Sequence, residues 1–346
     1  MRILVNDIAA SEGGAMTVLQ EFYRYIKENE MEHEWIFLLS QPCLEETARI
    51  KVITLPQIKS SRFKKLAFDF FTGRRFILSL HPDAVLSLQN IITFGLKVPQ
   101  TVYIHQSIPF QDVKQFSFFK STERTAAIYQ HLIGRVIKLS AKKASKVVVQ
   151  TEWMKKAVCS KANLPAEKVI TILPDILGAL NSSASFDNTA FFYPTADIIY
   201  KNNECIYKAC ELLSQSCSSD YHVKLTIERG VNDSHVEYIG RIPREQVLAA
   251  YAKSTLIFPS YIETFGYPLA EARQAGTVIL ASDCAFSHEV LQGYENAYYF
   301  NPFRPRELSD LMEKVITGQI AKKAVCEQRQ VRENSWAQLV REVIKA

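Results

Sequence analysis

Short apolar runs rich in β-branched residues alternate with helix-patterned segments along the whole 346-residue chain. Such alternation is typical of parallel sheets whose strands are connected by helices. The predicted strands of the first half are RILVND, EWIFLLS, KVITLP, AVLSLQN, TVYIH, KVVVQT and KVITILP, and those of the second half are AFFYP, VKLTIERG, HVEYIG, TLIFPS, TVILAS and AYYFNP. Because the chain is longer than an ordinary domain of roughly 150 residues, the pattern predicts an α/β protein with two Rossmann-like βα domains.

A polar stretch separates the two halves. Residues 175–190 (DILGALNSSASFDNTA) contain no basic residue, are rich in Ser, Asn and Asp, and show no clear periodicity, as expected of a linker. We therefore predict an amino-terminal domain over residues 1–180 and a carboxyl-terminal domain over residues 181–330.

The last segment, residues 331–346, has a different pattern. It contains an amphipathic helix with Trp336, Leu339, Val340 and Val343 on one side, and such an apolar face has to pack on something. We expect this helix to cross back to the first domain.

Several broad classes are excluded by what the chain lacks. The first residues, MRILVNDIAASEGG, contain no secretory hydrophobic region, and no run approaches the roughly 18 apolar residues of a spanning helix. The seven cysteines are odd in number and form no C-x-x-C pair, which argues against a disulfide framework and a zinc site. Neither G-x-G-x-x-G nor G-x-x-x-x-G-K-[ST] occurs, so dinucleotide oxidoreductases and P-loop enzymes lose their main support. We expect a cytoplasmic protein.

Charge is unevenly distributed. Residues 1–174 hold 24 basic and 15 acidic side chains, whereas residues 175–346 hold 17 and 21. Between residues 51 and 161 the count is 19 to 5, and aromatic residues are interleaved with the charges: Phe63, Phe68, Phe70, Phe71, Phe116, Phe118 and Phe119. This mixture suits an anionic membrane surface, and the absence of nucleic-acid-binding motifs argues against nucleic acid. A merely solvated basic face is the alternative.

The most informative segment is FPSYIETFGYPLAEARQAG, residues 258–276. Pro268 suits the first position of a helix, and Gly276 suits the residue that follows its end, so we predict a helix over residues 268–275. A helix amino terminus carries about half a unit of positive charge and unpaired amides, which favours a phosphate. The predicted phosphate-binding amides belong to Phe265, Gly266 and Tyr267.

Two carboxylates flank this loop. Glu263 precedes the predicted helix, and Glu271 is expected in its first turn. One is suited to a sugar and the other to a ribose. The alternative is that Glu271 only stabilises the helix dipole, which is worth roughly 0.3–1 kcal/mol, and that Glu263 is a loop charge.

Glu263 and Glu271, with seven residues between them, resemble the E-x7-E motif of the family 4 retaining GT-B glycosyltransferases. The resemblance extends over most of the chain, through Gly13-Gly14, KVVVQT, Lys201-Asn202 and Gly240. It implies the GT-B fold, in which two Rossmann-like domains with parallel sheets face each other across a cleft. The first domain would bind the acceptor and the second the nucleotide sugar.

The resemblance also implies roles for individual residues. Glu271 would hold the ribose hydroxyls of the donor, and Glu263 would be the catalytic carboxylate beside the donor sugar. Lys201 would neutralise the diphosphate, a role that suits an ammonium point charge. His105, at the end of TVYIH, would contact the donor sugar, although a lone histidine is also often structural. The amides of Phe265, Gly266 and Tyr267 would meet the sugar and the diphosphate.

One position departs from the family pattern. Thr195 stands where the family usually carries an arginine of the diphosphate clamp, so either another base such as Arg241 substitutes or donor affinity is low. Gly13 and Gly14 would allow close approach to donor phosphates or acceptor. Gly240 and Arg241 fall where the family's main chain meets the nucleobase.

These observations predict a retaining glycosyltransferase that moves a sugar from a nucleotide-diphosphate sugar to a lipid-linked or polysaccharide acceptor. The pathway expected is capsule, O-antigen or exopolysaccharide assembly, at the inner face of the membrane. No D-x-D motif occurs, so we expect no cofactor and no metal requirement. Two alternatives stay open: a GT-B sugar-nucleotide epimerase, and a catalytically weak partner that binds glycan or membrane and assists another transferase.

Overall fold

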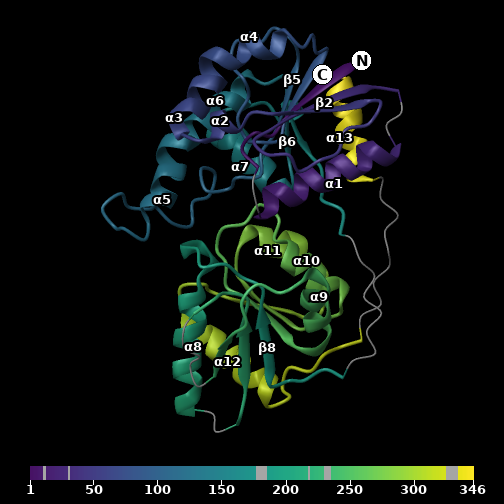
Figure 1. The fold of residues 1–346 in the computed structure, drawn as a ribbon. Coiled ribbons are helices and arrows are strands. Elements are labelled where there is room, and N and C mark those ends of the chain that lie inside the picture. The colour runs from purple at the N-terminus through teal and green to yellow at the C-terminus, as the bar shows by residue number, and fades with distance from the viewer. Residues whose placement is uncertain (11–12, 30–31, 177–184, 217–218, 230–234, 325–333) are drawn as a thin grey trace. The chain divides into compact units, whose positions relative to one another are not determined.

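The computed structural model describes the chain except for residues 11–12, 30–31, 177–184, 217–218, 230–234 and 325–333 (Figure 1). The chain forms two compact units. Unit 1 comprises Met1–Asp175 together with Arg332–Ala346, and unit 2 comprises Ile176–Val331. Half of the predicted linker, residues 177–184, lies outside the described residues.

Unit 1 contains a seven-stranded sheet with the order β3-β2-β1-β4-β5-β6-β7. Every strand pair in it is parallel. The strand order reverses beside β1, which pairs with β2 on one side and β4 on the other. The strands are β1 (Arg2–Asn6), β2 (Glu34–Leu39), β3 (Ile50–Thr54), β4 (Ala84–Ser87), β5 (Gln100–Tyr103), β6 (Lys146–Val149) and β7 (Val169–Thr171).

Helices connect these strands. They are α1 (Gly13–Asn29), α2 (Pro56–Lys59), α3 (Arg62–Ala67), α4 (Gly73–Leu78), α5 (Arg124–Ala127), α6 (Gly134–Lys143) and α7 (Glu152–Ala162). Two π-helical segments, Phe68–Thr72 and Ile128–Ile133, interrupt the helical path. Each ends at a glycine that has no room for a side chain: a Cβ on Gly73 would lie 2.5 Å from the Phe68 carbonyl oxygen, and one on Gly134 would lie 2.8 Å from Pro109.

The last helix, α13 (Ser335–Ile344), belongs to the core of unit 1. Its apolar face joins the cluster around α1 and the sheet, and the rings of Trp336 and Phe22 lie 5.6 Å apart. Lys146 of β6 pairs with Glu342 of α13 at 2.6 Å. Figure 1 shows α1 and α13 beside each other at the sheet.

Unit 2 repeats the plan with a six-stranded parallel sheet of order β10-β9-β8-β11-β12-β13. Here the order reverses between β8 and β11, which pair with each other. The strands are β8 (Ala190–Tyr193), β9 (His222–Leu225), β10 (Val236–Tyr238), β11 (Thr255–Phe258), β12 (Ile279–Ser282) and β13 (Ala297–Phe300). The helices are α8 (Asn203–Ser216), α9 (Arg244–Lys253), α10 (Tyr267–Gln274), α11 (Ala285–Val290) and α12 (Pro305–Ile316).

Burial on both faces explains why the strand sequences of unit 2 are continuous apolar runs. All residues of β8, β11 and β12 are buried, because helices cover both faces of a parallel sheet. The prediction of two Rossmann-like βα units with parallel sheets is therefore confirmed.

Candidate active site

The carboxyl edge of the unit 2 sheet gathers most of the predicted site residues. Ligands of open parallel sheets bind at the carboxyl ends of strands where the strand order reverses, which here is between β8 and β11. Lys201 lies on the segment after β8, and Glu263 lies on the loop after β11. The two side chains meet at this reversal point.

Lys201 is positioned by a short 3-10 turn, Ile199–Lys201. Its carbonyl oxygen accepts a hydrogen bond from the Tyr193 hydroxyl at 3.1 Å. The next residue, Asn202, has a φ of +60°, and its side-chain amide donates to the carbonyl oxygens of Pro259 at 3.2 Å and Pro302 at 2.8 Å. Asparagine tolerates this left-handed conformation, and its side chain ties the turn to the ends of β11 and β13.

Glu263 is held from two sides. The Lys201 Nζ lies 2.5 Å from its Oε1 atom, and the Ser260 hydroxyl lies 2.8 Å from the same oxygen. The Lys201 and Glu263 side chains are 21% and 15% exposed, so the ion pair is largely shielded yet reachable. Such a pair offers a cation for a phosphate and a carboxylate for sugar hydroxyls at one place.

The loop after Glu263 ends in helix α10. Gly266 precedes its first residue with a φ of +86°, and Pro268 lies in the first turn, where its missing N–H costs no helical bond. Gly276 follows the helix with a φ of +68°. The predicted helix is confirmed to within one residue at each end. Phe265 is buried, and its ring lies 5.4 Å from that of Tyr267.

We expect Gly266→Ala to destabilise this loop. A φ of +86° is unfavourable for a residue with a side chain, and the added Cβ would lie 3.3 Å from Leu269; the free energy of unfolding should fall by about 1–3 kcal/mol. Gly14→Ala is the matched control, because a Cβ there meets nothing within 4 Å and alanine favours the helix by about 0.5–1 kcal/mol. Thermal unfolding of both variants measures the difference, and an equal response would contradict this account of Gly266.

Glu271 is buried and already has partners. Its carboxylate pairs with Arg244 of α9 at 2.7 Å and accepts a hydrogen bond from the Tyr251 hydroxyl at 3.1 Å. Burial raises the pKa of this carboxyl, and Arg244 and Tyr251 oppose the rise. The expectation that Glu271 lies in the first helical turn is wrong, because α10 begins at Tyr267 and has no acidic residue in its first turn. Stabilisation of the helix dipole, which fades beyond the first turn, is therefore weakened as an explanation.

Thr195, Gly240 and Arg241 lie on neighbouring loops of the same sheet edge. The Thr195 hydroxyl donates to Asn203 Oδ1 at 3.0 Å, and its amide donates to the Thr226 hydroxyl at 2.8 Å. Gly240 has a φ of +66° and follows β10, while Arg241 is exposed. Thr195 thus serves to hold the loops after β8 and β9 together.

The remaining predicted residues belong to unit 1. His105 follows β5, and its amide donates to Asn90 Oδ1 at 2.7 Å. Burial lowers the pKa of its imidazole to about 4, so the ring is neutral at pH 7. Gly13 and Gly14 begin helix α1, and the space beside Gly14 shows that packing within the unit does not require a glycine there.

Sequence reasoning missed three features that hold the site in place: the structural role of Asn202, and the contacts of Arg244 and Tyr251 with Glu271. Ser260 is the last residue of the predicted strand TLIFPS, and its place at a strand end did mark it as a candidate. Arg244 and Tyr251 lie on α9 and reach Glu271 only through the packing of α9 on α10, which the sequence does not reveal.

Two Rossmann-like units, each built on a parallel sheet, correspond to the GT-B fold. Solved structures share this fold: WaaG, described as a glycosyltransferase involved in lipopolysaccharide biosynthesis, matches with a TM-score of 0.65 at 15% identity over 92% of this chain and 90% of that one. HepE of Anabaena, solved with UDP and glucose, matches with a TM-score of 0.62 at 16% identity over 100% of both chains.

Residues 217–334 match the family model of glycosyl transferases group 1. The O-antigen chain mannosyltransferase RfbU of Salmonella typhimurium is 23% identical over 289 residues, which cover 75% of this chain and 80% of that protein. O-antigen chain mannosyltransferase B of Escherichia coli is 33% identical over 66 residues, or 19% of this chain and 17% of the relative. Together these matches support a group 1 glycosyltransferase.

Proposed function

We propose that the chain is a retaining glycosyltransferase of family 4 that uses a nucleotide-diphosphate sugar and needs no metal. The observation that carries this proposal is the Lys201–Glu263 pair at the reversal point of the unit 2 sheet, next to the amino terminus of α10. Lys201 and the amides of Phe265, Gly266 and Tyr267 would bind the diphosphate. Glu271 would bind the ribose, with Arg244 fixing its orientation.

The chemistry follows a front-face course. The bond between the anomeric carbon and the diphosphate oxygen breaks, and the acceptor oxygen bonds to that carbon on the same face. The acceptor proton passes to the departing phosphate oxygen, so the configuration is retained. Lys201 would stabilise the charge that develops on the leaving group, and a positioned donor of this kind is typically worth about 3–4 kcal/mol. Glu263 and the neutral His105 would bind hydroxyls of the donor sugar.

The acceptor we propose is a lipid-linked or polysaccharide glycan of capsule, O-antigen or exopolysaccharide type. The names of RfbU and WaaG support this class. The donor sugar, by contrast, depends on contacts of a few atoms within the pocket.

A thermal-shift screen of UDP, GDP, dTDP, ADP and their common sugars tests the proposal. A nucleotide at 100 times its Kd adds about 2.7 kcal/mol to the free energy of unfolding. Glu271→Ala should reduce that shift, and Glu263→Ala should keep it while turnover is lost. Glu204→Ala, an exposed glutamate that pairs with Lys208 on α8, is the control.

The same screen separates the alternatives. If no nucleotide shifts the melting temperature, the catalytically weak partner is favoured and the transferase is rejected. If a nucleotide sugar alone is converted to its epimer, which NMR of the anomeric protons detects, the epimerase is favoured.

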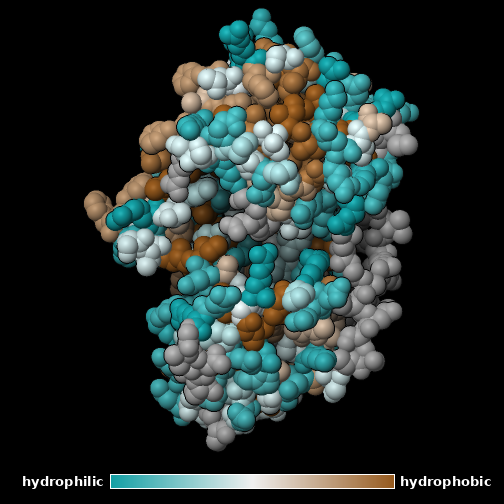
Figure 2. Space-filling view, in the orientation of Figure 1, coloured by the Kyte–Doolittle hydropathy of each residue, from teal (hydrophilic) through white to brown (hydrophobic). Residues whose placement is uncertain are grey.

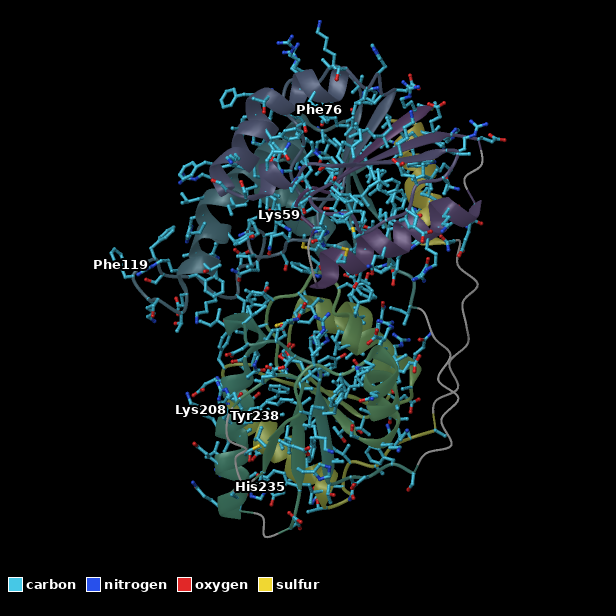
Figure 3. The ribbon with its side chains drawn as sticks, viewed as in Figure 1. Lys59, Phe76, Phe119, Lys208, His235 and Tyr238 are labelled. Atoms are coloured by element: carbon cyan, nitrogen blue, oxygen red, sulfur yellow. The ribbon has the colours of Figure 1, made fainter. Side chains whose placement is uncertain are left out.

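We further propose that unit 1 docks on anionic membranes from the cytoplasmic side. Three phenylalanines are strongly exposed: Phe63 on α3 at 84%, Phe71 in the π-helical segment before α4 at 77%, and Phe119 in the loop before α5 at 97%. Figure 2 shows apolar residues on this side of unit 1, and Figure 3 shows Phe119 projecting from its loop. Exposed basic residues accompany them, including Lys64 and Arg75. Among the described residues, no helix is both long and apolar enough to cross a bilayer.

The triple variant Phe63→Ser, Phe71→Ser and Phe119→Ser should bind vesicles at least about tenfold more weakly, since each phenylalanine loses apolar burial in the lipid interface. Cosedimentation with vesicles of phosphatidylglycerol and phosphatidylcholine measures this. Phe303→Ser is the matched control, because Phe303 is 51% exposed on unit 2. Equal binding to vesicles of phosphatidylcholine alone would contradict the role of anionic lipid.

A further inference from the structure

The unit 1 sheet has its own reversal point, and buried polar residues gather there. The strand order reverses between β1 and β4, so a ligand is expected outside the carboxyl ends of these two strands. Asp7 directly follows β1, and Gln89 lies two residues after β4. The donor-site residues of unit 2 occupy the equivalent places of their sheet.

Three acceptor atoms at this point have no hydrogen-bond partner among the described residues. They are both carboxylate oxygens of Asp7, which is 1% exposed, and the Oε1 atom of Gln89, which is 5% exposed. The nearby Ala10 amide donates to the main-chain oxygen of Asp7 at 3.2 Å. A buried polar group without a partner is destabilising and rare in native proteins, so these atoms call for an explanation.

Among the described residues, the nearby donors of Lys65, Gln89 and Lys59 have other acceptors. Lys65 Nζ lies 2.5 Å from Asp69 Oδ2, and the Gln89 side-chain amide donates to Asp69 Oδ1 at 3.2 Å. Asp69 is buried in the π-helical segment Phe68–Thr72. Lys59 Nζ, labelled in Figure 3, donates to the Ala10 carbonyl oxygen at 3.2 Å. Asp69 therefore engages Lys65 and Gln89, and the cluster keeps a surplus of acceptors.

A surplus of acceptors selects a ligand that brings donors. Hydroxyl groups of a sugar match this need, because each donates one hydrogen bond and neighbouring hydroxyls can reach a carboxylate and an amide oxygen together. Lys65 and Lys59 keep positive charge close to Asp7. Asn90 and His105, which continue the same sheet edge, are half-buried, so solvent reaches the edge there.

We propose that Asp7 and Gln89 bind hydroxyl groups of the acceptor sugar. That this sugar is the acceptor rests on the proposed transferase function, whereas sugar binding at Asp7 does not. Asp7 is a positioning residue in this account. It fixes which hydroxyl of the acceptor is presented, and so contributes to the linkage.

Saturation-transfer NMR with the methyl α-glycosides of mannose, glucose, galactose and N-acetylglucosamine tests the proposal. At least one glycoside should bind the full-length protein, and Asp7→Asn and Asp7→Ala should weaken it at least tenfold. Asp83→Asn is the matched control at the opposite edge of the sheet, where Asp83 accepts the Arg2 amide at 2.7 Å. Circular dichroism melts of each variant verify folding.

The thermal shift by UDP and GDP is recorded on the same samples. Asp7→Asn should leave that shift unchanged. Glycoside binding that survives both Asp7 substitutions, or that is absent from the wild type, overturns the proposal. A wild-type protein that binds a glycoside through Asp7 but no nucleotide supports the sugar site and rejects the transferase function.

Discussion

Lys201→Ala is expected to lower kcat by about a hundred- to a thousandfold, which corresponds to about 3–4 kcal/mol of lost transition-state stabilisation. The physical reason is twofold. The ammonium that would balance the leaving diphosphate disappears, and the shielded Glu263 carboxylate, now 2.5 Å from Lys201 Nζ, loses its counter-charge. Affinity for the nucleotide should fall as well. Steady-state kinetics and nucleotide titration by calorimetry separate the two effects.

Lys208→Ala is the matched control for this experiment. Lys208 lies on α8, the helix that follows the turn of Lys201, and makes an exposed pair with Glu204 at 3.3 Å. Such pairs are worth at most about 1 kcal/mol. Its replacement should leave kcat within a factor of two. If Lys201→Ala kept its turnover as Lys208→Ala does, the assignment of the donor site would be wrong.

Asp7→Asn is expected to stabilise the protein at neutral and alkaline pH. Burial raises the pKa of Asp7 from 3.8 to about 7, so the folded protein holds this proton more tightly than the unfolded chain. The free energy of unfolding of the wild type, relative to that of the variant, should therefore fall as the pH rises from about 4 to 7. Above pH 7 the difference between the two proteins should stay constant. Since one pKa unit is worth about 1.4 kcal/mol, the full difference approaches about 4 kcal/mol. Denaturant unfolding at several pH values measures it.

Asp69→Asn should lower the free energy of unfolding, the opposite of the effect expected for Asp7→Asn. Asp69 is buried and pairs with Lys65, whose side chain is 19% exposed. Removal of one partner of a fully buried pair typically costs about 3–5 kcal/mol, and the cost here should be below that range. If Asp7→Asn stabilises the protein and Asp69→Asn destabilises it, the Asp69 carboxylate stabilises the fold and the Asp7 carboxylate does not. If Asp7→Asn lowered stability at every pH, its carboxylate would be structural, and the ligand site would lose its support.

The two parallel sheets could be predicted from sequence because their strands are buried on both faces and read as continuous apolar runs. Helix α10 could be placed to within a residue because Pro268 and Gly276 mark its ends. The assignment of Glu271 to the first turn failed because it depends on the starting residue of the helix. The helix begins at Tyr267, directly after the left-handed Gly266 and one residue before Pro268. The partners of Glu271, Arg244 and Tyr251, lie on α9, and no local sequence pattern predicts that they contact it.

Asp7 illustrates a different limit. Its place at the end of the predicted strand RILVND was visible in the sequence. The lack of hydrogen bonds to its carboxylate, however, depends on where Lys65 and Gln89 direct their donors. That choice follows from the π-helical segment that carries Asp69. A single extra residue in a helical turn has no reliable sequence signature. The cluster of Asp7, Asp69 and Gln89 could therefore not be predicted from the sequence.

The return of α13 to unit 1 has a consequence for synthesis of the chain. On the ribosome, residues 176–331 emerge before Trp336, so unit 2 has all of its own chain available while unit 1 still lacks one helix of its core. Domains generally fold as units as they are made, which means that the unit synthesised first is the one completed last. Until α13 has been made, the apolar surface around Phe22 stays open to solvent and to chaperones, and a premature stop codon before residue 335 would leave it so permanently.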